Sequence, residues 1–384
     1  MKEDKSIYFS GLNSLRFIAA LAVIITHVEL LKGVFNFNSC YKNIVIFNLG
    51  GLGVYFFFVL SGFLITYLLL AEKKISNEID IKKFYYRRIF KIWPLYYFIV
   101  ILGFFVLPNF DFFKISYLQE NFINNFYSNL LLYVLILPNI AFSFFSAVPN
   151  IGQAWSIGIE EQFYIFWPWV VSKTNNLLKS LLYIILGIII IKIIVLMIGQ
   201  YHQSNMIYLA IKKSIAMSKF ECMAIGGIGA KLLIDNHQLL NLVYNKISIN
   251  ISLVLIILLI FLTPDKIQDG IHIVYSILFL IIILNVSNNS VKINLENKVL
   301  NYLGKISYGI YMYHFMIIPP ILYFLKRFNN IESEIVLNIL IYMLSIGLSI
   351  LISSISYEYF EKHFILMKSK FSVIKSGIKN NTIT

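Results

Sequence analysis

The chain has 384 residues, of which 59% are hydrophobic and only 13% are charged. A soluble domain carries roughly twice that charged fraction, so the composition excludes a soluble globular protein and predicts a polytopic membrane protein. The net charge of +13 is explained by positive cytoplasmic loops, without nucleic acid as a partner. Cys40 and Cys222 belong to no Cys-x-x-Cys pair, so no zinc site or disulfide framework is expected, although a single bridge stays open.

Apolar stretches recur along the whole chain. The first follows Lys2 and Lys5 and contains Arg16; because no small-residue cleavage site follows it, it is predicted to be a membrane helix and not a signal peptide. Ten further candidates lie near residues 50–71, 89–107, 127–146, 155–171, 181–200, 219–234, 248–263, 271–286, 304–325 and 333–360.

Basic residues concentrate in the 72–91 loop and after Glu361, which predicts that both segments are cytoplasmic. Two cytoplasmic termini require an even number of spans, so one of the eleven stretches is not a span. It is expected within residues 127–171, where AVPNIGQAW and two glutamates break the apolar pattern and a re-entrant segment fits. We predict an all-α helical bundle of about ten transmembrane helices in the plasma membrane, with a membrane domain over residues 1–364 and a disordered cytoplasmic tail over 365–384.

The stretch RFIAALAVIITH carries an arginine at its start and a histidine at its end. Eleven helical positions place Arg16 and His27 within about 20° of one face and roughly 16 Å apart along the axis. With Arg16 at the cytoplasmic interface, His27 lies near the midplane, where it can act as a general base on substrates from both sides. A buried histidine that bonds a backbone carbonyl, beside a snorkelling arginine, explains the pattern equally well.

A basic cluster stands in FYYRRIFKIWPLYY, residues 84–97. On a helix Arg87, Arg88 and Lys91 are about one turn apart, so three cations can converge on a multiply charged anion such as a nucleotide phosphate. The positive-inside bias alone also predicts basic residues before an apolar run, and it is the favoured interpretation of this cluster taken by itself.

Two adjacent glutamates interrupt QAWSIGIEEQFYIFWPW, residues 153–169. Ser156, Glu160 and Tyr164 share one helix face, whereas Glu161 points about 100° away. One carboxylate could orient an imidazole or accept a proton, and the other could pair with an arginine. A structural ion pair between helices is the alternative.

The C-terminal stretches KISYGIYMYHF and YEYFEKHF add His314 and Glu361 as candidates. Ionisable groups in apolar surroundings usually face a bundle interior or a wet cavity. For these two residues, packing and pairing at helix interfaces is the favoured interpretation.

Together these stretches resemble the acyltransferase 3 family of bacterial membrane O-acyltransferases, from about Gly11 to Phe364. GLNSLRFIAALAVIITH is similar to the family's opening helix with its Arg-x10-His motif, and GLGVYFFFVLSGFLITYLL, which contains Ser61, is similar to its second helix. RRIFKIWPLYY resembles an Arg-x2-Arg motif with Lys91 in place of the second arginine. AWSIGIEEQFYIFWP matches a Trp-Ser-x3-Glu-Glu-Gln-Phe-Tyr block, and KFECMAIGGIGA, LGKISYGIYMYH and YFEKHF are similar to later blocks.

The resemblance implies transfer of an acyl group, usually acetyl, from cytoplasmic acyl-CoA to a hydroxyl of a surface or exported glycan. It implies that His27 deprotonates this hydroxyl or that of a relay residue, with orientation or charge stabilisation from Glu160 or Glu161. The residues implied in holding the CoA are Arg16, Arg87, Arg88, Lys91 and Ser61. Some members carry an appended extracytoplasmic esterase-like domain; because about twenty residues follow the last expected helix, transfer is expected to finish within the membrane domain.

Two other functions stay open at this point. A transporter or flippase would also place His and Glu residues in the bundle, although the sequence shows no inverted repeat of the kind that many transporters have. An acyltransferase that acts on a small lipid or macrolide differs only in its acceptor. The sequence leaves the acceptor, the acyl chain and the oligomeric state open.

Overall fold

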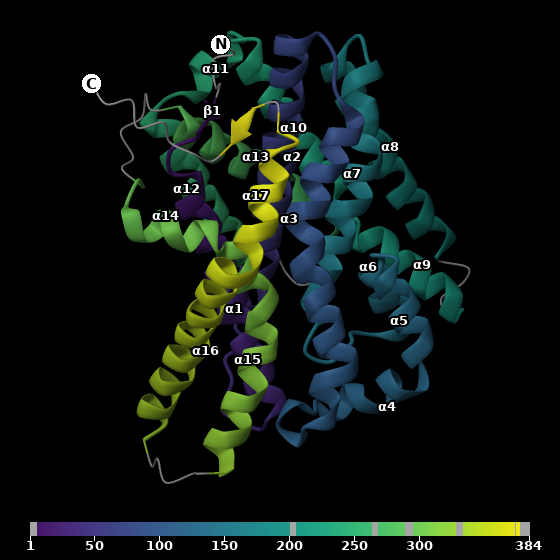
Figure 1. The fold of residues 1–384 in the computed structure, drawn as a ribbon, viewed down its shortest axis with the longest axis vertical. Coiled ribbons are helices and arrows are strands. Elements are labelled where there is room, and N and C mark those ends of the chain that lie inside the picture. The colour runs from purple at the N-terminus through teal and green to yellow at the C-terminus, as the bar shows by residue number, and fades with distance from the viewer. Residues whose placement is uncertain are drawn as a thin grey trace.

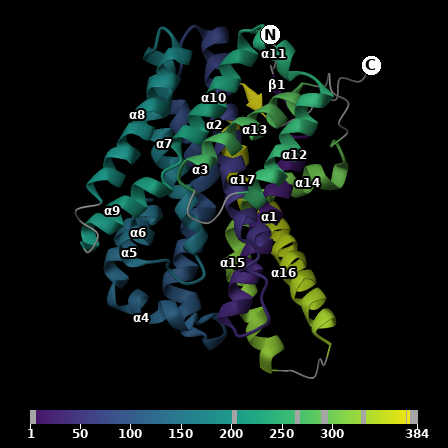
Figure 2. The ribbon, with the colours of Figure 1, turned by 180° about the vertical axis from the view of Figure 1, so that it is seen from behind.

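The computed structural model describes residues 6–199, 205–262, 268–288, 295–327, 333–372 and 374–376, and this part of the chain is helical except for one pair of two-residue strands (Figure 1, and from behind in Figure 2). The first half contains β1 (Ser6–Ile7), α1 (Leu12–Val34), α2 (Ile44–Ser76), α3 (Ile81–Ile101), α4 (Ser116–Asn124), α5 (Phe126–Val134), α6 (Pro138–Phe145), α7 (Trp155–Lys173) and α8 (Leu177–Ile198). The second half contains α9 (Met206–Met217), α10 (Phe220–Ile234), α11 (Leu239–Val243), α12 (Lys246–Leu262), α13 (Gln268–Ser287), α14 (Lys298–Lys305), α15 (Ser307–Arg327), α16 (Glu334–Ser356), α17 (Lys362–Ser369) and β2 (Lys375–Ser376). Short 3-10 turns are formed by Leu107–Asn109, Asp111–Phe113 and Gly152–Ala154, and π-helical turns by Leu102–Val106 and Tyr357–Glu361.

The centre of the bundle is α2, which packs against α1, α10 and α13. Glycines let α2 and α10 approach until their backbones touch. A Cβ atom on Gly62 would lie 1.9 Å from the carbonyl oxygen of Met223, and one on Gly226 would lie 2.0 Å from that of Val59. Small residues at such crossings are how membrane helices reach close van der Waals contact.

Seven helical segments of the described chain are long and apolar enough to cross a membrane: Leu12–Val34, Ile44–Ser76, Ile81–Asn109, Leu177–Ile198, Gly270–Ser287, Ser307–Arg327 and Glu334–Ser369. The predicted count of about ten is therefore not confirmed. The remaining apolar stretches form helices that are shorter or charged: α10 has 15 residues, α12 has 17, and α7 carries two glutamates. Because β1 pairs with β2, both lie on one side of the bundle, and the number of crossings must be even. The number of helices that cross between the two strands is therefore not seven.

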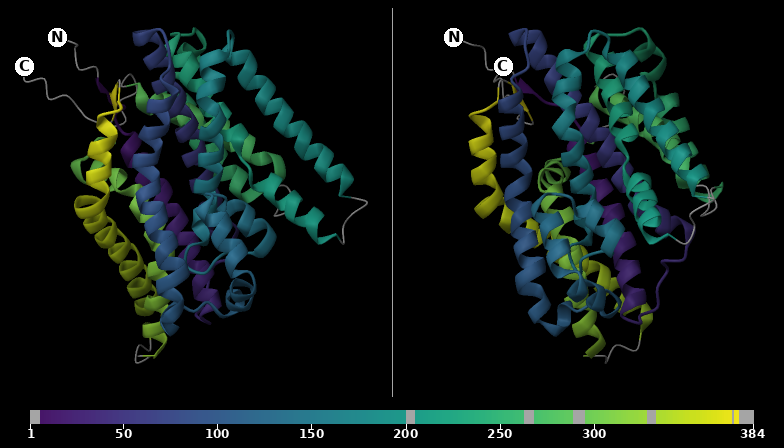
Figure 3. Two further views of the ribbon diagram at one scale, coloured as in Figure 1. Left: turned by 45° about the vertical axis from the view of Figure 1, so that its right-hand side comes forward. Right: turned by 90° about the vertical axis from the view of Figure 1, so that its right-hand side faces the viewer.

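The interruption predicted within residues 127–171 is present. The apolar stretch over 127–146 is divided between α5 and α6, which have 9 and 8 residues. Ile136, in the turn between them, has a positive φ of 58°. The helices α4 and α5 lie toward the end of the molecule opposite β1 and β2, beside the long α3 (Figure 3).

The C-terminal segment differs from the prediction, because α17 runs through the expected domain boundary at residue 364. Residues 365–372, expected to be disordered, include most of α17, which packs against α3. The carbonyl oxygen of Phe371 accepts a hydrogen bond from Arg87 Nη1 at 3.0 Å, and the Phe371 ring lies 4.8 Å from that of Tyr86. After α17, the chain forms β2, which pairs in parallel with β1. These contacts compensate the ordering of a segment whose composition alone favours disorder.

Candidate active site

A cavity of about 660 Å³ opens at the end of the bundle that carries β1 and β2. Its wall comes from α1, α2, α3, α7, α14, α15 and α17, so segments from both ends of the chain contribute. Pockets of 300 to 1,000 Å³ are typical of small-molecule and cofactor sites. The charged residues of its lining are Arg16, Arg88, Lys91, Lys305, Lys362, Lys368 and Glu160.

Four of these six cations are partly buried and form no ion pair with a carboxylate, whereas Lys305 and Lys362 are exposed. Within the described ranges, no ion pair involves Arg16, Arg88, Lys91 or Lys368. The guanidinium of Arg88 instead lies 5.7 Å from the ring centre of Tyr164, and its buried Nε atom has no hydrogen-bond partner. These four cations share the cavity with one carboxylate, that of Glu160. Such an excess of positive charge inside a membrane protein is costly, so this cavity is suited to an anion.

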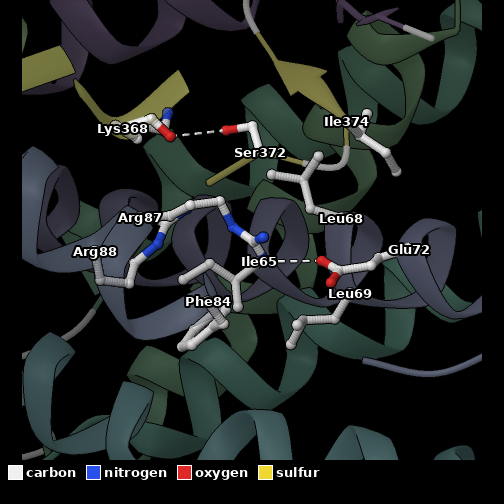
Figure 4. A pocket seen from close by; sticks show the side chains of 10 residues that line it. All are labelled: Ile65, Leu68, Leu69, Glu72, Phe84, Arg87, Arg88, Lys368, Ser372 and Ile374. Atoms are coloured by element: carbon white, nitrogen blue, oxygen red, sulfur yellow. Dashed lines mark hydrogen bonds and ion pairs between the residues drawn. The ribbon is translucent and has the colours of Figure 1, made fainter. Parts of the chain in front are cut away.

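Arg87 does not join this group, contrary to the predicted convergence of Arg87, Arg88 and Lys91. Its Nη2 atom lies 2.7 Å from Oε2 of Glu72, and Nη1 donates to the Phe371 carbonyl. Figure 4 shows Arg87 reaching toward Glu72, in a hollow of about 20 Å³ beside the main cavity. Successive helical residues point about 100° apart, which is why Arg87 and Arg88 diverge.

Lys368 is the partly buried cation of the lining that the sequence interpretation missed. It lies on α17 and lines both the large cavity and the small hollow. No signal in the sequence separates it from the other lysines of the C-terminal segment. Only the packing of α17 against α3 brings it to the same space as Arg88.

The predicted face of Ser156, Glu160 and Tyr164 does point into the cavity, where Ser61 joins it. The hydroxyl of Tyr164 donates to Oε2 of Glu160 at 2.7 Å and is also hydrogen-bonded to the Ser61 hydroxyl. The Ser61 Oγ atom lies 3.4 Å from the same carboxylate oxygen. The Glu160 carboxylate therefore accepts hydrogen bonds from two hydroxyl groups.

Glu161 points away from this face, as its position on the helix predicts. Its Oε2 atom accepts from Trp93 Nε1 at 2.8 Å, while its buried Oε1 has no partner. No ion pair in the described chain includes Glu160 or Glu161. In the described residues, neither carboxylate is therefore in direct contact with an arginine.

His27 lies outside the cavity lining, against His314 of α15. Its Nδ1 atom is 2.7 Å from Nε2 of His314. Tyr311, which does line the cavity, bonds the Ser156 hydroxyl at 2.7 Å, and its ring centre lies 5.8 Å from that of His314. The residues Ser156, Tyr311, His314 and His27 thus form a chain of contacts from the cavity to the histidine on α1.

Glu361 lies in the contact between the C-terminal helices and does not line the cavity. Its Oε1 atom accepts from the Ser356 hydroxyl at 3.1 Å, and Ser356 accepts from Tyr313 at 2.9 Å. The predicted packing role fits Glu361. It also fits His314, which is buried on α15 and contacts His27 of α1.

Tyr8 lines the cavity near β1. Its hydroxyl donates to Oε1 of Glu296 at 2.8 Å. Burial and the Glu296 carboxylate raise the pKa of Tyr8 to about 12, so the phenol stays protonated at neutral pH.

Comparison with known proteins identifies relatives over most of the chain. A family model described as an acyltransferase domain matches residues 9–358. A Staphylococcus aureus strain COL protein named Putative O-acetyltransferase SACOL0978 is 30% identical over 386 residues, which cover 94% of this chain and 58% of that protein. The O-acetyltransferase OatA of S. aureus strain NCTC 8325 / PS 47 is 26% identical over 377 residues, which cover 92% of this chain and 57% of OatA. No solved structure matches the chain.

The chain thus spans less than two thirds of the length of these two relatives. The matched residues include Arg16, His27, Arg88, Glu160 and His314, whereas α17 lies beyond them. The family model covers far more than half of the sequence, and the motifs that it covers form the histidine pair and most of the cavity wall. The chain therefore belongs to the acyltransferase 3 family.

Proposed function

We propose that this protein transfers an acyl group, most simply acetyl, from cytoplasmic acyl-CoA to a hydroxyl of a surface or exported glycan. The observation that carries the proposal is the cavity in which Arg16, Arg88, Lys91 and Lys368 have no carboxylate partner. The nucleotide end of CoA carries several phosphate charges, which these cations would neutralise. The names of the two relatives support the choice of acetyl and of a hydroxyl acceptor.

The cavity wall suits the rest of the donor as well. Apolar side chains, among them Phe57, Leu64 and Ile65, line it beside the cations. The pantetheine arm is largely uncharged and would lie along these side chains. The thioester would then reach the Ser156 and Tyr311 hydroxyls, the part of the lining nearest to the histidine pair.

The orientation of the bundle in the membrane follows from charge. Lys73, Lys74, Lys82 and Lys83 surround the junction of α2 and α3 at the end of the bundle that carries the cavity. By the positive-inside rule, this charge supports a cytoplasmic position for this end, on the side where acyl-CoA is available. The acceptor would approach His27 from the opposite side, and a lipid-linked glycan meets that requirement.

The donor half of the proposal is tested by kinetics of the purified full chain in proteoliposomes. The assay follows release of the CoA thiol from acetyl-CoA, with a glycan fraction from cells that lack the gene as acceptor. Acetyl-pantetheine lacks the nucleotide phosphates, so its KM should exceed that of acetyl-CoA on the order of 10²-fold. Equal KM values for the two donors would contradict a phosphate-binding role for the cavity.

Arg88→Lys refines the same test. Lysine keeps the charge but loses the planar pair of donors, so the KM for acetyl-CoA should rise roughly tenfold, about 1 to 2 kcal/mol. Arg327→Lys is the matched control, because Arg327 is exposed at the far end of α15. An unchanged KM for Arg88→Lys would mean that the basic residues only set topology.

The base is tested with His27→Ala. A general base contributes roughly 10² to 10⁴ in rate, so transfer should be lost while acetyl-CoA still protects the protein from thermal unfolding. Near-normal transfer by this variant would end the assignment of His27. Substrate movement across the vesicle membrane without CoA release would instead support a transporter.

A further inference from the structure

The two histidines meet edge to edge. Nδ1 of His27 lies 2.7 Å from Nε2 of His314, the ring centres are 5.0 Å apart and the ring planes differ by only 5°. The centre-to-centre distance equals the nitrogen contact plus one ring radius at each end. The two nitrogens therefore face each other in the plane of both rings, which is the geometry of a hydrogen bond and not of a face-to-face stack.

The backbone of α15 decides which nitrogen donates. Nδ1 of His314 lies 3.3 Å from the carbonyl oxygen of Ile310. A carbonyl only accepts, so this Nδ1 carries the proton and the neutral ring keeps its lone pair on Nε2. His27 must then donate from Nδ1, which leaves the lone pair of His27 on Nε2. The arrangement thus selects one tautomer of His27.

Among the described contacts, no glutamate accepts a hydrogen bond from Nδ1 of His27. Glu160 is bonded to Tyr164 and Ser61, and Glu161 to Trp93. The expected orientation of the imidazole by one of these carboxylates is therefore not found among the described contacts of His27. His314, which is fully buried, occupies the position that a carboxylate holds in a Ser-His-Asp triad.

We infer that His314 is a positioning residue. It accepts a hydrogen bond from Nδ1–H of His27 throughout the reaction and so holds His27 in the tautomer with a basic Nε2. This inference rests on the proposed function, in which His27 is the base. The acceptor hydroxyl gives its proton to Nε2 of His27 as its oxygen attacks the acyl carbonyl. The ester bond forms, the thioester C–S bond breaks, and the proton passes from His27 to the sulfur, so CoA leaves as a thiol.

Ring contacts support the same arrangement. The Phe315 ring stands perpendicular to His27, with centres 4.9 Å apart, and so limits rotation of the imidazole. Tyr311 lies against His314 and also lines the donor cavity. The pair is thus fixed on the side of the bundle where the thioester is proposed to arrive.

A matched pair of amide variants tests the inference. In His314→Gln the amide oxygen can reach the place of Nε2, whereas the shorter side chain of His314→Asn cannot reach it. We expect His314→Asn to lower kcat for CoA release by about 10²-fold or more, and His314→Gln to recover most of this loss. The KM for acetyl-CoA should stay unchanged in both. Equal kcat values for the Gln and Asn variants would overturn the inference.

A double-mutant comparison separates this inference from the proposed function. If His314 acts through His27, then adding His314→Asn to His27→Ala should lower the residual rate no further. A further 10²-fold loss in the double variant would show that His314 acts by another route. If His27→Ala is itself fully active, the proposed base fails, and the inference falls with it. Wild-type kcat in His314→Asn, beside an inactive His27→Ala, overturns only the inference.

Discussion

The guanidinium of Arg87 lies 2.7 Å from the carboxylate of Glu72, in an ion pair that joins α3 to α2 with side chains only 11% and 4% exposed. The next residue, Arg88, faces the cavity without such a partner. Two adjacent arginines therefore have different tasks, one structural and one suited to a ligand, and substitutions should separate them.

Arg87→Met should destabilise the protein without changing the KM for acetyl-CoA. It leaves the buried Glu72 carboxylate without its cation, at a cost of about 3 to 5 kcal/mol. The apparent Tm in detergent measures this loss, and exposed Arg327→Met is the control. In Glu72→Leu/Arg87→Met the combined loss should be smaller than the sum of the single losses. Additive losses would contradict a direct ion pair.

Lys368→Ala should raise the KM for acetyl-CoA by roughly tenfold or more, since a charged hydrogen bond contributes about 1.5 to 3 kcal/mol. Lys370→Ala, two residues on and exposed, should leave the KM unchanged. Steady-state kinetics on both variants gives the comparison. If they behave alike, α17 does not contribute to the donor site.

Gly226→Ala should lower the amount of folded protein sharply, because its Cβ would lie 2.0 Å from the Val59 carbonyl oxygen. Gly187→Ala and Gly347→Ala are matched controls, since nothing lies within 4 Å of a Cβ at either position. Both controls should be neutral or more stable by up to about 1 kcal/mol, the helix preference of alanine. Fluorescence-detected size-exclusion profiles report the outcome. A normal profile for Gly226→Ala would show that α2 and α10 are farther apart than described.

The two native cysteines test the orientation. Cys40 is exposed in the loop between α1 and α2, at the end opposite the cavity, whereas Cys222 is buried in α10. With the cavity in the cytoplasm, a membrane-impermeant maleimide added to intact cells should label Cys40, and Cys40→Ser should remove the signal. Labelling that appears only after the membrane is opened would reverse the orientation.

The sequence was sufficient for features that depend on periodicity. The shared face of Ser156, Glu160 and Tyr164 follows from a spacing of four residues, and the structure places all three in the cavity. The helical bundle and the break within 127–171 follow from apolar patterning and from the residues that interrupt it.

Features that depend on tertiary contacts could not be predicted in this way. Arg87 and Glu72 are fifteen positions apart and on different helices, and His27 and His314 are separated by most of the chain. The local sequence around each of these residues does not indicate which distant residue it contacts. Lys368 could not be predicted for the same reason. Its sequence resembles a solvated basic tail, and only the packing of α17 against α3 brings it to the cavity. The predicted span count is not confirmed, because length alone does not decide whether the shorter helices cross.

The closure of one cavity by both ends of the chain also has a consequence for biosynthesis. Tyr8 and Ser372 line the same space although nearly the whole sequence lies between them. A ribosome-bound chain that has inserted α1 to α16 still lacks the wall that α17 supplies. If the cavity binds the acyl donor as proposed, a nascent molecule would bind that donor only weakly until α17 has emerged and packed.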